Sequence, residues 1–99
     1  MAERDPAAST PSVTVTVRYF AAARAAAGVT EETVSVPAAG PDLPTSVGVV
    51  VATAGERHPA LGRVLPRCSF LLDEVAVHGP ATAVLDGQVL DVLPPFAGG

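Results

Sequence analysis

The chain has 99 residues, 48% of them hydrophobic and 16% charged, which predicts one globular domain with a modest core and excludes a disordered chain. Its net charge of -4 is unfavourable for binding nucleic acid phosphates, and no apolar run reaches the roughly 18 residues of a membrane span. The single cysteine, Cys68, excludes an internal disulfide or a cysteine metal cluster, and we expect it to be a buried small hydrophobe.

Residues 1–11 are polar and small, and they lack the apolar segment of a secretory signal. We therefore expect a disordered N-terminal lead over residues 1–11 and a cytoplasmic protein.

From Ser12 the pattern becomes a strict alternation, with valine at positions 13, 15 and 17 and polar residues between them. This pattern predicts a half-buried strand that runs to Tyr19 or Phe20. The alanine-rich residues 21–27 follow and predict a short helix, closed by Gly28 as its C-cap. A second alternating run, residues 30–36, predicts a strand that pairs antiparallel with the first and ends at Pro37.

Residues 37–44 are rich in proline, glycine and alanine and predict a loop. The next segment, 46–58, is ambiguous: its valines favour a buried strand, whereas apolar residues at 47, 50, 51 and 54 fit one face of a helix. Thr45 or Ser46 can cap a helix, and about 13 residues is an ordinary helix length. We expect a helix, intrinsically weakened by Gly48 and the valines.

The remaining chain predicts short elements. Residues 61–66 are expected to be a loop with apolar residues turned inward, and short strands are expected at 68–73 and 75–77. Residues 80–85 predict a turn and a short extended segment, 86–87 a tight turn, and 88–93 the final strand. On that strand Asp91 should be solvated, which places Leu93 on the same exposed face.

The histidine and lysine content limits the reactions that side chains of this protein can carry out. His58 and His78 are the only histidines, and neither has a cysteine or acidic neighbour at catalytic or metal-binding spacing, so both are expected on the surface. All six basic residues are arginine, so no lysine is available to attack an activated C-terminus, and the chain cannot form lysine-linked chains with itself.

The predicted order is strand, short helix, strand, longer helix, short strands and a final strand. This order describes an α+β roll with one mixed sheet of four to five strands and one main covering helix. The last strand is expected beside the first, in parallel. The domain should span residues 12–93, with an extended C-terminal tail over 94–99.

That tail carries the most informative pattern in the sequence. Pro94 has no N–H to donate, so the strand should end at Leu93, and the two prolines favour extended chain before them. Fully extended, the residues after Leu93 reach roughly 20 Å at about 3.3 Å each. Gly98 and Gly99 have no side chains, so a narrow tunnel can admit them up to the carboxylate.

Three motifs stand in the chain: Val-Arg-Tyr-Phe-Ala-Ala-Ala-Arg at 17–24 with Gly28, the predicted helix end at His58-Pro59, and Asp86-Gly87 before the final Pro-Pro-Phe-Ala-Gly-Gly. With them the sequence resembles the small subunit of molybdopterin synthase, in the family of ubiquitin-like β-grasp sulfur carriers. The resemblance covers roughly residues 12–99 and implies a β-grasp roll with a protruding Gly-Gly tail.

The resemblance also implies a mechanism. An E1-like partner would use ATP to adenylate Gly99, and sulfur transfer would convert the adenylate to a thiocarboxylate. The tail would then enter the large subunit of the synthase, where the sulfur passes to a pterin precursor of the molybdenum cofactor. The chain itself would bind no cofactor and would not be catalytic alone, because Gly99 acts only as the covalent carrier.

The resemblance implies partner-binding roles for residues of the tail and of the surface next to it: Phe20, Arg24, Leu93, Pro94, Pro95, Phe96, Ala97 and Gly98. From the residues alone, Phe20 fits core packing equally well, and Arg24 fits a solvated helix charge.

Two other interpretations remain open. One is a sulfur carrier that serves cysteine or thiamine biosynthesis. The other, from a different class, is a ubiquitin-like protein modifier or binding module, which would link Gly99 to a lysine of a target protein or dock without chemistry.

Overall fold

A computed structural model describes residues 12–38 and 44–95 of the chain. The expectations for residues 1–11 and for Phe96, Ala97, Gly98 and Gly99 therefore lie outside the described residues, as does most of the expected loop at 37–44.

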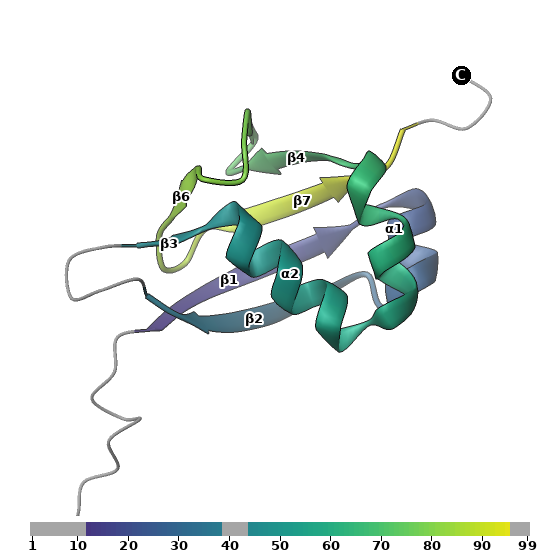
Figure 1. The fold of residues 1–99 in the computed structure, drawn as a ribbon, viewed down its shortest axis with the longest axis horizontal. Helices are drawn as coiled ribbons and strands as arrows, with labels where there is room; N and C mark the ends of the chain where they lie inside the picture. The colour runs from purple at the N-terminus through teal and green to yellow at the C-terminus, as the bar shows by residue number, and fades with distance from the viewer. Residues whose placement is uncertain (1–11, 39–43, 96–99) are drawn as a thin grey trace, which may run out of the picture.

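A five-stranded mixed sheet forms one layer and helices cover one of its faces (Figure 1). The strand order is β2-β1-β7-β4-β5. The strands of this sheet are β1 (Ser12–Tyr19), β2 (Glu31–Pro37), β4 (Ser69–Leu72), β5 (Val75–Ala76) and β7 (Val89–Leu93). A separate two-stranded ribbon pairs β3 (Thr45–Ser46) with β6 (Ala83–Val84).

The first and last strands lie side by side in the middle of the sheet. β1 pairs antiparallel with β2 and parallel with β7, whose other edge pairs antiparallel with β4. The predicted α+β roll, the antiparallel first hairpin and the parallel closing strand are all confirmed. Because β1 and β7 run the same way, β7 ends where β1 passes into the first helix.

The two predicted α-helices are present. α1 (Ala21–Ala27) ends at Gly28, whose φ of +79° is left-handed and whose N–H donates to the carbonyl of Arg24, as expected of a glycine C-cap. α2 (Val47–Arg57) begins at Ser46, whose hydroxyl accepts from the Val49 N–H. Burial of Val47, Val50 and Ala54 against the sheet confirms the helical reading of this segment.

One expectation about the secondary structure is wrong. The segment predicted as a loop at 61–66 belongs to two 3-10 helices, η2 (Pro59–Arg63) and η3 (Leu65–Arg67). Proline is favourable in the first turn of such helices because the N–H it lacks has no partner there, and both begin with a proline at their first or second position. Leu61 is fully buried, which anchors the segment to the core.

The core fills the space between the sheet and the helices. Alternate residues of β1 and β2 point into it, together with one face of α2, two alanines of α1 and two residues of β7. Its buried apolar residues are Val13, Val15, Val17, Tyr19, Ala23, Ala27, Val34, Val36, Val47, Val50, Ala54, Leu61, Leu72, Val84, Leu90 and Val92. Among the described residues, no helix is long and apolar enough to cross a membrane.

Candidate functional site: the root of the C-terminal tail

The tail starts from the middle of the sheet. β7 has a paired strand on each side, which makes Leu93 the last residue of a well-anchored strand. Pro94 is half-buried and Pro95 exposed. A proline cannot extend the hydrogen-bond ladder, so the chain leaves the sheet at this point, as the sequence predicts.

The face of the sheet away from the helices carries a buried charge. Asp91 on β7 is 5% exposed, and its carboxylate accepts from Arg18 on β1, with 2.6 Å to Nε and 3.0 Å to Nη2. The expectation that Asp91 is solvated is therefore wrong. The parallel register sets Arg18 beside Asp91, and the bidentate guanidinium replaces the water that the carboxylate loses. This hydrogen bond, with the charge of Asp91, raises the pKa of Arg18.

Phe20 and Leu93 stand next to this ion pair on the same open face. Phe20 directly follows β1, its N–H donates to the carbonyl of Val92, and its side chain is exposed, with 38% of the residue's surface accessible. The Arg18 guanidinium lies over the Phe20 ring, 5.8 Å from its centre, in a cation–π contact. Leu93 is half-buried rather than fully exposed. The structure thus places Phe20 outside the core and beside the tail.

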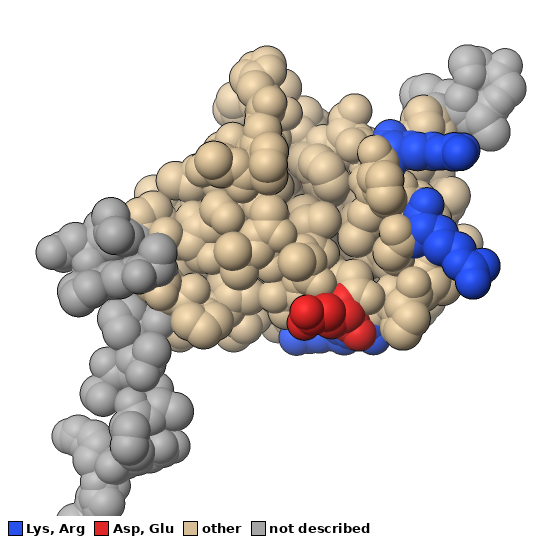
Figure 2. Space-filling view, viewed as in Figure 1, with Lys and Arg blue, Asp and Glu red and all other residues tan. Residues whose placement is uncertain are grey.

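The helical side of the tail root is different in character. A groove of about 270 Å³ is lined by residues of α1, of η2 and η3 and of the tail: Ala22, Arg63, Val64, Arg67, Pro94 and Pro95. Both arginines are exposed. Figure 2 shows basic side chains gathered at this end of the molecule, toward which β1 and β7 run. The predicted partner-binding residue Arg24 is also exposed, on α1.

A second polar cluster lies between the sheet and the C-terminus of α2. The carboxylate of Glu32 on β2 accepts from the Tyr19 hydroxyl at 2.5 Å and lies 2.7 Å from His58 Nε2, and Arg57 Nη1 donates to it at 3.3 Å. The ring of His58 also packs edge-on against Tyr19, with 6.1 Å between ring centres. His58 is therefore a half-buried, partnered side chain, and the expectation of a surface histidine is wrong for it.

This cluster shifts the pKa of two of its members. Burial alone would raise the pKa of Glu32, but hydrogen bonds from Tyr19, His58 and Arg57 outweigh it and lower that pKa. Burial, and the bond to Glu32, raise the pKa of Tyr19. The cluster joins β1, β2 and the end of α2 through hydrogen bonds, so its arrangement fits a structural clamp.

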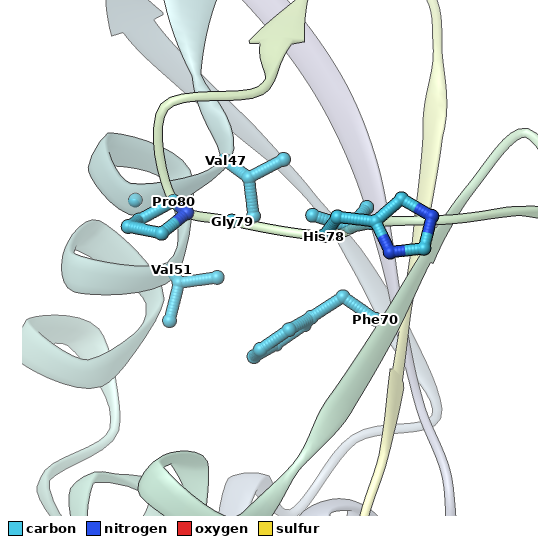
Figure 3. Close-up of a pocket in the computed structure, with 8 residues that line it drawn as sticks. Val47, Val51, Phe70, His78, Gly79 and Pro80 are labelled. Carbon is cyan, nitrogen blue, oxygen red and sulfur yellow. The ribbon is translucent and has the colours of Figure 1, made fainter.

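Other candidate sites offer less chemistry. An apolar groove of about 230 Å³ lies between α2 and residues 77–80, and the Phe70 ring points toward Val51 while the His78 imidazole turns away from the valines (Figure 3). His78 is exposed, as expected. A binding site for a small polar ligand needs several polar groups that converge on it, and His78 is the one polar side chain among the residues that line this groove.

Cys68 is half-buried, its thiol donates to the Val64 carbonyl at 3.3 Å, and burial raises its pKa, all consistent with the expected structural role. Within residues 12–38 and 44–95, no group of three or more His, Cys, Asp or Glu side chains is placed to hold a metal ion.

The structure brings most of the described candidate residues together. Phe20, Leu93, Pro94 and Pro95 surround the tail root, and Arg24 lies on the adjoining helix. Arg63 and Arg67 were missed, because Arg63 lies in the expected loop at 61–66 and Arg67 directly follows it. No local pattern marks them as neighbours of the tail, because their position depends on how η2 and η3 pack beside α1.

The sheet is mixed, its final strand lies parallel to the first, one main helix covers it, and two prolines directly follow the last strand. This combination defines a ubiquitin-like β-grasp protein. Residues 17–99 match the ThiS family, and the chain belongs to that family of ubiquitin-like sulfur carriers.

Individual relatives agree with this assignment. The molybdopterin synthase sulfur carrier subunit of Chlamydomonas reinhardtii is 33% identical over 86 residues, which cover 86% of this chain and 98% of that relative. The crystal structure of SAMP1 from Haloferax volcanii is 26% identical with a TM-score of 0.73, covering 87% of this chain and 99% of that one. A chain in the complex of subunits 1 and 2 of the molybdopterin-converting factor from Helicobacter pylori shares the fold, with a TM-score of 0.58, 23% identity and coverage of 88% and 100%.

Proposed function

We propose that the chain is the sulfur-carrying small subunit of a molybdopterin synthase. The observation that carries this proposal is the similarity to the Chlamydomonas reinhardtii sulfur carrier subunit, which extends over 98% of that relative. The position of Pro94 and Pro95, directly after the central strand β7, supports it, because a tail that starts from a rigid strand can be presented at a fixed angle.

The chemistry is assigned to the carboxyl group of Gly99. Its carboxylate attacks the α-phosphate of ATP on an E1-like partner and displaces pyrophosphate, which gives an acyl adenylate. A sulfur nucleophile then replaces AMP at the acyl carbon, and the product is a thiocarboxylate. The ATP belongs to the activating partner, and the chain supplies only the carboxyl group and its presentation.

The receiving partner is the large subunit of the synthase. Gly98 and Gly99 enter its pocket, Ala97 and Phe96 follow, and Phe20, Arg24, Leu93, Pro94 and Pro95 contact its surface. Exposure of Phe20 beside the tail root supports this role, since a solvent-facing aromatic ring held by an arginine offers apolar area at low entropic cost.

The test is intact-mass spectrometry after incubation with an E1-like activating enzyme from the same genome, ATP and a sulfur donor. We expect the mass to rise by the difference between one sulfur and one oxygen atom. A variant that lacks Gly99 should show no such change, whereas Arg4→Gln, a substitution in the N-terminal lead, should behave as the unmodified chain does. An unchanged mass with an activator that modifies a known carrier would rule out the proposal.

A second candidate is a protein modifier, which the similarity to SAMP1, a small archaeal modifier protein, favours. Here Gly99 would form an isopeptide bond with a target lysine. Because Arg67 is the last arginine and the chain has no lysine, trypsin would leave residues 68–99 as a branch on the target. Such branched peptides support the modifier; their absence beside a detected thiocarboxylate supports the synthase subunit.

A further inference from the structure

The arginines of the described chain fall into two groups. Arg18 and Arg57 are ion-paired, with Asp91 and Glu32. Arg24, Arg63 and Arg67 form no salt bridge with any described residue, and all three are exposed. They stand on α1, η2 and η3, and α1 packs against η2. The chain carries a net charge of -4, and within the described residues the arginines that form no salt bridge lie on these neighbouring elements.

Arg63 and Arg67 lie against the tail itself. They line the same groove as Pro94 and Pro95, with Ala22 and Val64 as its apolar lining. We call these two arginines the arginine edge. On the open face of the sheet, the surface next to the same prolines carries Phe20 and Leu93 instead. The root of the tail therefore has one basic side and one apolar side.

This difference matters for how a globular body is oriented on a partner. An extended tail inside a channel fixes the distance of the body from the channel mouth, but it leaves the body free to rotate about the tail. Two chemically unlike sides at the root remove that freedom if the channel mouth is also two-sided. An apolar lip matches Phe20 and Leu93, and an acidic lip matches the arginine edge.

We propose that the arginine edge docks against carboxylate side chains at the mouth of the channel that accepts the tail on the synthase large subunit. The inference rests on the carrier function proposed above. A mouth that is acidic all round would repel the body of the chain, which is itself acidic. A mouth with acidic residues on one side attracts only the arginine edge and repels the orientations that present the acidic surfaces.

The absence of lysine allows a direct test of the contact. In an Arg67→Lys variant, the new ammonium is the only side-chain amine of the chain. Carbodiimide joins an amine to a carboxylate that touches it, so with the large subunit from the same genome we expect a cross-linked peptide containing residue 67. The unsubstituted chain cannot give this product, and Arg4→Lys, in the N-terminal lead, provides the matched control. A complex that forms without a cross-link from residue 67 overturns the proposal.

Association kinetics give an independent readout. Arg63→Gln/Arg67→Gln lowers the net charge by two, and Arg4→Glu, a substitution near the N-terminus of the sequence, lowers it by the same two. At about 50 mM salt we expect the double variant to bind the large subunit about 10-fold more slowly, and at about 500 mM salt the difference should vanish. Arg4→Glu should stay within about twofold of the parent chain.

The outcomes separate the two proposals. Equal slowing of both variants, or none in either, overturns the arginine edge while leaving the carrier function in place. If the parent chain itself neither binds the large subunit nor acquires a thiocarboxylate, the proposed function fails. Thermal unfolding followed by circular dichroism checks that both variants keep the fold. The double variant is expected to keep it because Arg63 and Arg67 are exposed.

Discussion

Three side chains converge on the Glu32 carboxylate, and this makes stability depend on pH. Tyr19, His58 and Arg57 all contact it, and they lower its pKa below the value of about 4.3 found in unfolded chains. The unfolded chain therefore takes up the proton first as pH falls. The stabilisation is fully present above about pH 4.3 and is lost as pH drops through the lower pKa of the folded state.

Glu32→Gln should remove most of this stabilisation. At pH 7 we expect the free energy of unfolding to fall by about 1–3 kcal/mol, the usual cost of weakening hydrogen bonds to a charge that is partly removed from solvent. As pH falls through the lowered pKa of Glu32, the variant and the parent should approach each other, because the parent then loses the same charge. Urea unfolding at pH 7 and at decreasing pH measures this. Glu56→Gln, an exposed change on α2, should alter neither value, and a loss in the Glu32 variant that persists unchanged at low pH would contradict the assignment.

Single residues also mark the limit of what the sequence predicts. The patterns correctly place Asp91 on the open face of its strand, but they wrongly predict that its carboxylate is exposed to solvent. Its partner Arg18 is 73 residues away, and His58 and Glu32 are 26 apart. Such pairs are set by strand register and helix docking, and neither is encoded in a local pattern.

At the scale of elements, two glycines of α2 have opposite roles. A Cβ on Gly48 would lie 3.1 Å from Pro80 Cβ and 3.2 Å from its carbonyl oxygen. The Gly48 N–H donates to that same oxygen at 2.9 Å, so the helix start and the 79–80 segment are held close together. A Cβ on Gly55 would meet only the end of the Leu65 side chain, at 3.3 Å, which can turn aside.

The two alanine substitutions should therefore change the free energy of unfolding in opposite directions. Gly55→Ala should stabilise the fold by about 0.5–1 kcal/mol, because alanine is the better helix former. Gly48→Ala gains the same propensity but forces the Pro80 backbone away, and we expect a net loss of about 1–2 kcal/mol. Guanidinium unfolding of both variants measures the difference. If Gly48→Ala were as stable as Gly55→Ala, the contact with Pro80 would not limit the packing of α2.

Gly48 also shows how element prediction works for this chain. From the sequence, Gly48 is expected to weaken a valine-rich helix. The helix is nevertheless present, because Val47, Val50 and Ala54 bury one of its faces and Ser46 caps its start. Periodicity and caps are local, so β1, α1 and α2 are predictable. The 3-10 helices were not, because their prolines and Gly62 resemble loop punctuation, and only burial of Leu61 reveals that the segment is packed.

At the scale of the molecule, the first and last strands determine where the tail begins. The sequence predicts β7 beside β1 in parallel, and the register then brings Tyr19 level with Val92. Phe20 and the start of α1 consequently lie at the tail root, although they are more than 70 residues away along the chain. The candidate residues 93–95 were predictable from the prolines. The basic side of the root was not, because it depends on how η2 and η3 pack beside α1.

This architecture predicts that folding and tail chemistry are separable. Every buried apolar residue of the described core lies between Val13 and Val92. A chain truncated after Pro95 should therefore unfold within about 0.5 kcal/mol of the parent in urea, as surface changes usually do. Leu90→Ala, on the same strand and fully buried, should cost about 2–5 kcal/mol. The truncated chain should nevertheless acquire no thiocarboxylate. A truncation that destabilises as much as Leu90→Ala would mean that the tail is part of the fold, and loss of sulfur transfer would then say nothing about Gly99.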